Sequence, residues 1–311
     1  GLSKDIPVSQ FPAKLVLELR SLTRKYYDLT DERSAHINKL KGDLHTVFPQ
    51  YLDVFCDVTG KTSTMILRQY GTPDKILRGH KKTMIEKISK ASRKGLAKAS
   101  ERYEKLCAAA NAAKTFGCQI DSIYFNIFLT LDLVEKLDSA LDSILNRIRQ
   151  LITFNKNEKF IQQIKLLNTI PGVGFLTAVT IMCEIGDFSA FRNPKQLFAY
   201  FGLDPEVNES GKFVGTQLHM SKRGSRIARR AIFAVALASI RTKRNGEGIN
   251  PYLRKYYELK SGQKPKMVAI GAVMHKVCNI VFAVLRDEKA FELRSPEEHC
   301  KQYQRPALAA A

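Results

Sequence analysis

The sequence lacks the features that most directly indicate a metal site or a membrane span. Its six cysteines include no CxxC spacing, which argues against zinc and iron–sulfur sites and favours reduced thiols in a cytosolic protein. No signal peptide is recognisable, and the longest apolar run, from Ala231 to Ile240, is too short to span a bilayer. We therefore expect a cytoplasmic protein with no membrane partner.

Repeats, low-complexity tracts and alternating strand patterns of any length are also missing. The expected fold class is therefore all-α. One segment, FVGTQL between Gly211 and His219, is a candidate for a short strand or an extended turn.

Acidic residues are scarce relative to basic ones. The chain has 50 Lys and Arg against 30 Asp and Glu, a formal charge of +20, and the stretch from Gly211 to Lys266 alone holds 14 Lys and Arg against 2 acidic residues. A charge of this sign favours polyanions, and release of counterions from phosphates would make nucleic-acid binding sensitive to salt.

Two segments have the periodicity of long helices. One runs from about Phe11 to Val47, and the other from Asp121 to about Phe154 with Asp138 as its single polar interruption. We predict that they pair as an antiparallel, coiled-coil-like arm. A seam does not identify its partner, so pairing of each helix with a second copy of the chain stays open. The first seam is predicted at Leu15, Leu19, Leu22, Tyr26 and Leu29.

The predicted organisation has five segments. They are a first arm helix at 1–48, a small helical insertion at 49–118, a second arm helix at 119–160, a helical domain at 161–290 and a tail at 291–311, whose closing RPALAAA resembles a vector-encoded sequence. Seven Lys and Arg residues crowd positions 81 to 98 of the insertion. They indicate either a solvated helical face or a surface that contacts phosphates.

A helix, a glycine turn and a second helix are predicted between Leu166 and Ile185. Pro171 restricts the chain, and Gly172 and Gly174 let the backbone turn with its amides pointing outward. This is the helix-hairpin-helix pattern, in which backbone amides hold a phosphate without reading bases. Plain helix packing is the alternative for the same geometry.

A serine ahead of a basic helix is the candidate for covalent chemistry. Ser210 lies in a predicted turn, before a helix that starts near Lys222 or Ser225. Nearby guanidinium groups would stabilise both a serine alkoxide and a phosphodiester under attack. The alternative is a turn serine that bonds its own backbone. The residues expected to bind nucleic acid are Gly172, Val173, Gly174, Thr177, Lys212, Lys222, Arg223, Arg226, Arg229 and Arg230; no metal ligand is predicted.

Together these motifs resemble a known family. TIPGVG with TAVTI, then FRNPKQLFAYFGLDP, SGK, SKRG and the arginine-rich helix are similar to the C-terminal domain of the IS110/IS1111 insertion-sequence transposases, relatives of the Piv-type DNA invertases. The resemblance is strong from Leu166 to about Leu285. It implies that Ser210 is a nucleophile for DNA cleavage and exchange in a homo-oligomer, a dimer or tetramer. One branch of the family uses a bridge RNA, so a noncoding guide RNA is a further expected partner.

The start of the chain departs from the family pattern. The family has an N-terminal RuvC-like domain whose four acidic residues bind Mg²⁺, but only about ten residues precede the first helix here, and Asp5 is their one carboxylate. We therefore expect no cofactor in this chain, with Mg²⁺ belonging to the missing domain, and no recombination by the chain alone. The competing functions are a non-catalytic nucleic-acid-binding module and a structural coiled-coil adaptor.

Overall fold

The computed structural model describes residues 13–206, 209–210, 213–214 and 220–298 of the chain. These residues form helices and one pair of two-residue strands, so the predicted all-α class is confirmed. The chain divides into two compact units, which we call unit 1 (1–25 and 145–311) and unit 2 (Tyr26–Ile144). Their boundaries fall inside the two long helices rather than at the helix ends. The five-segment division stays a prediction.

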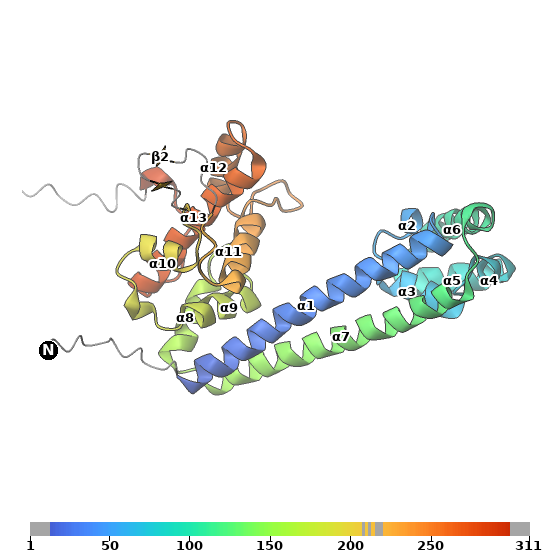
Figure 1. Cartoon of the computed structure of the whole chain (residues 1–311), viewed down its shortest axis with the longest axis horizontal. Helices are drawn as coiled ribbons and strands as arrows, with labels where there is room; N and C mark the ends of the chain where they lie inside the picture. Colours follow the sequence, from blue (N-terminus) through green and yellow to red (C-terminus); the bar gives the residue numbers. More distant parts are fainter. Residues whose placement is uncertain (1–12, 207–208, 211–212, 215–219, 299–311) are drawn as a thin grey trace, which may run out of the picture. The chain divides into compact units, whose positions relative to one another are not determined.

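Two long antiparallel helices, α1 (Lys14–Val47) and α7 (Asp121–Phe154), lie side by side in Figure 1, and unit 2 is built on their parts 26–47 and 121–144. Both were predicted with nearly these limits. The direction follows from two contacts, because the hydroxyl of Tyr124 donates to the carbonyl of Val47 at 3.4 Å, while Arg33 pairs with Asp138 further along α7. The polar interruption of the second seam is therefore the partner of an arginine on α1.

The buried face of α1 is rotated from the predicted seam over its first turns. Val16, Thr23 and Tyr27 are buried, whereas Leu15, Leu22 and Tyr26 are only partly covered. Leu19 and Leu29 are buried as predicted, so the periodicity was right and the seam is displaced by about one residue only at its other three positions. Packing selects the phase because a helix buries the stripe that faces its neighbours, and a residue beside that stripe stays at the edge whatever its hydrophobicity.

Five further helices complete unit 2, as expected for the predicted helical insertion. They are α2 (Tyr51–Val54), α3 (Lys61–Gln69), α4 (Pro73–Arg78), α5 (Lys81–Ser92) and α6 (Leu96–Phe116). Thr72 caps α4 by accepting from the amide of Lys75. Their apolar side chains share one core with the end of α1 and the start of α7, which includes Leu44, Val47 and Ile127.

Unit 1 contains the predicted helical domain. Its elements are α8 (Lys159–Leu167), α9 (Phe175–Ile185), the 3₁₀ turn η1 (Phe188–Ala190), α10 (Pro194–Tyr200), β1 (Glu209–Ser210), β2 (Phe213–Val214), α11 (Arg226–Ser239), α12 (Pro251–Ser261) and α13 (Lys266–Asp287). Helix α13 packs against α8, α10, α11 and α12, and α9 packs against α8 and α11. Eight consecutive residues of α9, from Ala178 to Ile185, are buried.

Helix α13 has 22 residues and is longer than the apolar run from Ala231 to Ile240 noted in the sequence. By length and composition it could cross a membrane, but 56% of its apolar stretch is buried inside the protein, as in a core helix. The five described cysteines are free thiols, in agreement with the expectation from their spacing.

Candidate nucleic-acid interface

The glycine turn joins α8 to α9, as predicted. Gly172 has a positive φ of 97°, which favours glycine, and Gly174 is the N-cap of α9 with no side chain capping the helix. The first amides of α9 have no partner inside the helix, so its N-terminus can attract an anion. Thr177 lies in this first turn and is half-buried.

The two glycines of the turn have different surroundings. A Cβ on Gly172 would lie 2.5 Å from Oγ of Ser239, the last residue of α11, and that hydroxyl donates to the carbonyl of Pro171 at 2.9 Å. Val173 is also buried. A Cβ on Gly174 would meet nothing within 4 Å. Helix packing therefore accounts for Gly172 and Val173, and only the Gly174 side of the turn is open to a ligand.

Basic residues that the sequence reasoning did not assign to the turn lie close to it. The loop after α11 continues from Ser239 to the exposed Arg241, Lys243 and Arg244. Arg149 on α7 lies over the ring of Phe175, 5.9 Å from its centroid. The sequence signal was the RTKRN run, but nothing in it linked this run to a turn some 70 residues earlier.

The predicted serine region is held at the opposite end of α11. Gly202 has a φ of 65°, and a Cβ on it would overlap the backbone of Arg223 and Gly224. Asp204 accepts two bonds from Ser221, one from the amide at 2.8 Å and one from the hydroxyl at 2.6 Å. Pro205 and Met220 form an isolated bridge. We call the paired segments 202–205 and 220–224 the clasp.

Ser210 lies beyond the clasp in a strand, which corrects the predicted turn. It pairs with Phe213 in the antiparallel pair β1–β2, so FVGTQL starts with a short strand as one alternative predicted. The side chain of Ser210 lies outside the described part of the structure, as does Lys212. That Ser210 is a nucleophile stays a prediction.

The basic residues at and just before the start of α11 differ in their exposure. Lys222, Arg223 and Arg226 are exposed. Arg229 instead donates to the carbonyls of Phe201 at 3.1 Å and Gly224 at 2.7 Å, and burial lowers its pKa. It therefore links the end of α10 to the start of α11. Arg230 is half-buried.

A buried carboxylate beneath this end of α11 was missed. Glu184, in α9, has a side chain 2% exposed and accepts from Nε and Nη2 of Arg24 at 2.8 and 2.9 Å. The carbonyl of Glu184 accepts from the hydroxyl of Tyr200 at 3.1 Å, and Arg20 donates to the neighbouring carbonyl of Cys183 at 2.7 Å. The sequence signal was a single charge in the apolar run FLTAVTIMCEI, which requires a partner when the helix is buried.

Hydrogen bonds determine the charge state of Glu184. Burial alone would raise its pKa, but hydrogen bonds from Arg24 and Ser225 and the charges of Arg24 and Arg20 lower it below the usual value. Ser225 is also the N-cap of α11, where it accepts from the amide of Ala228 at 3.1 Å. The ionised Glu184 thus supports the residue at which the basic helix begins.

The predicted binding residues therefore form two sites rather than one. The glycine turn lies at the C-terminal end of α11, and the clasp lies at its N-terminal end. Helix α11 has 14 residues, so its ends are separated by about 21 Å at a rise of 1.5 Å per residue. One phosphate cannot contact both ends, but an extended nucleic acid can.

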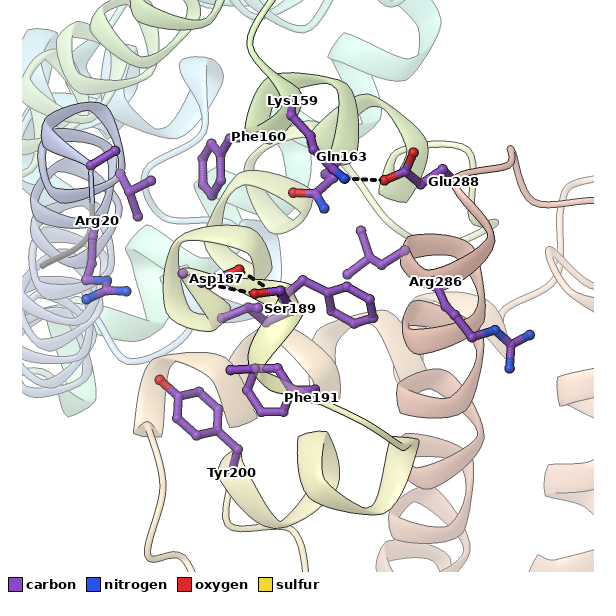
Figure 2. A pocket seen from close by; sticks show the side chains of 17 residues that line it. Arg20, Lys159, Phe160, Gln163, Asp187, Ser189, Phe191, Tyr200, Arg286 and Glu288 are labelled. Carbon is purple, nitrogen blue, oxygen red and sulfur yellow. Dashed lines mark hydrogen bonds and ion pairs between the residues drawn. The ribbon is translucent and has the colours of Figure 1, made fainter. Parts of the chain in front are cut away.

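A cavity of about 1430 Å³ in unit 1 contains none of the predicted site residues (Figure 2). Its charged residues include two that have partners within the lining: Lys159 pairs with Glu288 at 2.6 Å, and Asp187 accepts from the amide and hydroxyl of Ser189 at 2.9 and 2.8 Å as the cap of η1. Tyr200 also lines the cavity. No group of three or more His, Cys, Asp or Glu that could hold a metal ion occurs in the described residues.

The comparisons with known proteins fall on this region. Residues 164–258 match the Transposase IS116/IS110/IS902 family. The chain is 23% identical to an uncharacterized 43.6 kDa protein of insertion element IS110 from Streptomyces coelicolor, over 91% of this chain and 66% of the relative. It is 30% identical to the pilin gene-inverting protein of Moraxella bovis, over 57% of this chain and 52% of the relative. It is 26% identical to the transposase for insertion sequence element IS1111A from Coxiella burnetii, over 58% of this chain and 50% of the relative.

The chain thus spans between half and two thirds of the length of these relatives. The matched segment 164–258 contains the glycine turn, the clasp and all of α11. These findings confirm the resemblance: the segment 164–258 matches the IS116/IS110/IS902 transposase family, and the relatives named above belong to insertion elements or invert a pilin gene.

Proposed function

We propose that this chain is the C-terminal part of a DNA transposase or site-specific recombinase in which Ser210 is the nucleophile. The observation that carries the proposal is the family match over 164–258, which contains the Ser210 strand, the clasp and the basic start of α11. Among the relatives, one is named a transposase and another a gene-inverting protein, and both names denote rearrangement of DNA.

The proposed step exchanges one phosphodiester for another. Oγ of Ser210 attacks a DNA phosphorus, the bond from phosphorus to one sugar oxygen breaks, the serine proton passes to a base and the leaving sugar oxygen gains a proton. Because the number of phosphodiesters is unchanged, attack by a hydroxyl of a second strand can reverse the step without an energy source and so join new partners. In our proposal the exposed Lys222 and Arg223, just before α11, stabilise the phosphorane charge.

The described residues contain no acidic cluster that could hold Mg²⁺. In our proposal the metal and its carboxylates belong to a part of the protein outside this chain, and a homo-oligomer with a guide RNA brings the two parts to the DNA. The 311-residue chain alone is then expected to be inactive.

The test is trapping of a covalent protein–DNA adduct by the full-length protein with its DNA and RNA. We expect an adduct that survives denaturation and disappears in Ser210→Ala. The matched control is Ser221→Ala, which loosens the clasp but keeps the nucleophile, so its adduct forms more slowly but still at Ser210. Labelling the two DNA ends separately identifies a 5′ or 3′ link. An unchanged adduct in Ser210→Ala would exclude the assignment.

A non-catalytic nucleic-acid-binding module is the second candidate. The open Gly174 side of the turn and the exposed Arg241 and Arg244 favour it, because amides and guanidinium groups there can hold a backbone whatever Ser210 does. It predicts that Arg241→Gln with Arg244→Gln weakens duplex binding, while Ser210→Ala leaves both binding and DNA rearrangement unchanged.

A further inference from the structure

Unit 2 carries a concentration of positive charge that the proposed function does not use. Residues 75–105 hold eleven Lys and Arg against three acidic residues, a net charge of +8. We propose that seven of these cations, which we call the basic tip, bind the phosphate backbone of a nucleic acid independently of Ser210. The basic tip consists of Lys82, Lys87, Lys90, Arg93, Lys94, Lys98 and Arg102.

The fold brings these cations to one end of unit 2. Helices α5 and α6 pack against each other, and Met84 and Ile88 anchor α5 in the core while Leu106 anchors α6. The loop between the two helices is held by a bond from the hydroxyl of Ser89 to the carbonyl of Lys94 at 2.7 Å. All members of the basic tip are exposed except Arg102, which is half-buried.

No member of the basic tip has a carboxylate partner among the described residues. Two of the three acidic residues nearby are already paired with cations outside the basic tip: Glu101 with Lys105 at 2.8 Å, and Glu104 with Lys81 at 3.9 Å. A solvated helix ordinarily mixes charges so that neighbours three or four residues apart attract. In the basic tip a single carboxylate, Glu86, lies four residues from both Lys82 and Lys90, so positive charge stays in excess and an anion of repeated charge would relieve the repulsion among the seven cations.

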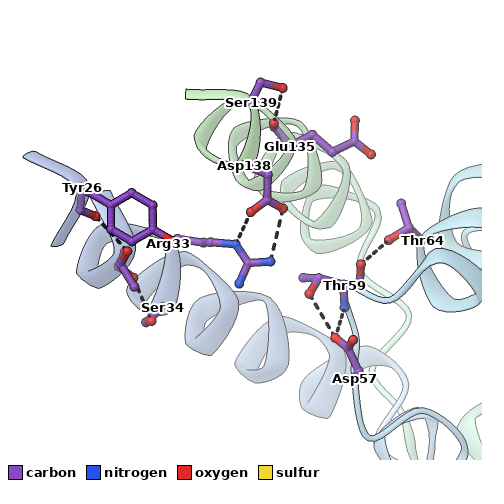
Figure 3. A network of polar contacts seen from close by, with 10 residues as sticks. Tyr26, Arg33, Ser34, Asp57, Thr59, Thr64, Glu135, Asp138 and Ser139 are labelled. Atoms are coloured by element: carbon purple, nitrogen blue, oxygen red, sulfur yellow. Dashed lines mark hydrogen bonds and ion pairs between the residues drawn. The ribbon is translucent and has the colours of Figure 1, made fainter. Parts of the chain in front are cut away.

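The rest of unit 2 shows the opposite balance. Its parts of the long helices, 26–47 and 121–144, hold nine acidic residues against four Lys and Arg. Acidic residues there have arginine partners, because Arg68 contacts Asp132 at 2.7 Å and Glu135 at 2.9 Å. Figure 3 shows the pair of Arg33 with Asp138 in the same region. Charge is therefore sorted within the unit, which a merely solubilising surface does not require.

A cleft within the basic tip has the dimensions and donors for a phosphate group. It has a volume of about 270 Å³ and is lined by Lys94, Lys98, Arg102 and Lys105, with Ser92, Asp53 and Glu101 as its other polar residues. The guanidinium of Arg102 lies 5.6 Å from the ring centroid of Phe55, a contact that restrains its plane. Arginine held in this way can present two parallel donors to phosphate oxygens.

The extent of the basic tip favours a polymer over a single anion. Helix α5 has 12 residues and is about 18 Å long, and its cations continue through the loop into α6. Successive phosphates of a nucleic acid supply negative charge over such a length. Contacts of this kind position a nucleic acid without reading its sequence.

The test measures binding of the full 311-residue chain to a 25-base-pair duplex of arbitrary sequence at several salt concentrations. The variant Lys82→Gln, Lys90→Gln, Lys94→Gln, Lys98→Gln removes four charges from the basic tip. The matched control, Lys39→Gln, Lys41→Gln, Lys61→Gln, Lys136→Gln, removes four charges elsewhere in unit 2. None of the eight lysines has a carboxylate partner among the described residues, so both variants should fold like the parent, which thermal unfolding verifies.

We expect the slope of log affinity against log salt to fall by about three to four in the tip variant and by less than about one in the control. An RNA hairpin tested in parallel shows which nucleic acid loses more affinity. Equal slopes for the tip variant and its control would overturn the proposal. Binding to vesicles of anionic lipid is measured with the same variants. If the tip variant loses binding only to the vesicles, the proposal is overturned as well. The result is independent of Ser210, because adduct formation is not measured and Ser210→Ala retains the basic tip.

Discussion

Helix α1 is joined by arginine to a carboxylate in each unit, and the two pairs differ mainly in burial. In unit 1, Arg24 contacts Glu184, whose side chain is 2% exposed. In unit 2, Arg33 contacts Asp138, with side chains 29% and 47% exposed. Both arginines use Nε and Nη2. The same kind of pair therefore contributes differently to stability, because water can replace the arginine partner of Asp138 but cannot reach the buried Glu184.

The largest difference is expected on removing the arginine. Arg24→Ala leaves a buried carboxylate without its main partner, and we expect a loss of about 2 to 3 kcal/mol in the free energy of unfolding, below the usual range for buried pairs because Arg24 is itself half exposed. Thermal or urea unfolding measures it. The double variant Arg24→Ala, Glu184→Leu should recover part of the loss, and no recovery would show that Arg24 acts mainly through packing.

The next largest loss of stability is expected on removing Ser225, the N-cap of α11, which also lowers the pKa of Glu184. Ser225→Ala removes both the N-cap of α11 and a hydrogen bond to the carboxylate, and should cost about 1 to 2 kcal/mol. The matched control is Asn193→Ala, which removes the N-cap of α10, for which no contact with a buried carboxylate is seen. Unfolding should show the smaller loss for Asn193→Ala. Equal losses would mean that Glu184 gains nothing from the cap.

The pH dependence of stability should also distinguish the buried pair. The folded-state pKa of Glu184 is lowered, so its contribution is present above its unfolded pKa of about 4.3 and is lost as pH falls through the folded value. Below about pH 4.5 the unfolding free energy of the parent should therefore fall more steeply than that of Glu184→Gln, by at most one proton or about 1.4 kcal/mol per pH unit. Parallel curves would contradict a lowered pKa.

The smallest effect is expected at the less buried pair, Arg33 with Asp138. Arg33→Ala and Asp138→Ala should each change the unfolding free energy by about 1 kcal/mol or less, with a coupling of about 0.5 kcal/mol in the double-mutant cycle. Raising salt from 0.1 to 1 M should reduce this coupling more than that of Arg24 with Glu184. A coupling above that of the buried pair would reverse the ranking.

Periodicity predicted the elements of the fold better than their contacts. The limits of α7 follow from local spacing and were predicted closely. The partner of Asp138 was not predicted, because a seam records which side of a helix is buried but not which side chain reaches it. The same limit explains the phase error at Val16 and Tyr27, where neighbours decide between adjacent stripes.

In the candidate site too, the sequence identified residues but not the groups that they contact. The sequence identified Arg229 as a cation but not the carbonyls of Phe201 and Gly224 that occupy its donors. It identified Gly172 as a turn residue but not the hydroxyl of Ser239 that fills the space beside it. Glu184 could have been found as a lone charge in an apolar helix, although its partner Arg24 lies 160 residues away.

The clasp has a consequence for how the chain can be altered. Residues 202–205 and 220–224 lie on either side of the segment that contains Ser210. They are held to each other by backbone contact, by the Asp204–Ser221 bonds and by the Pro205–Met220 bridge. A cut in the peptide between 206 and 220 would therefore leave both new ends tied to the domain. We therefore expect the fold of unit 1 to survive such a cut.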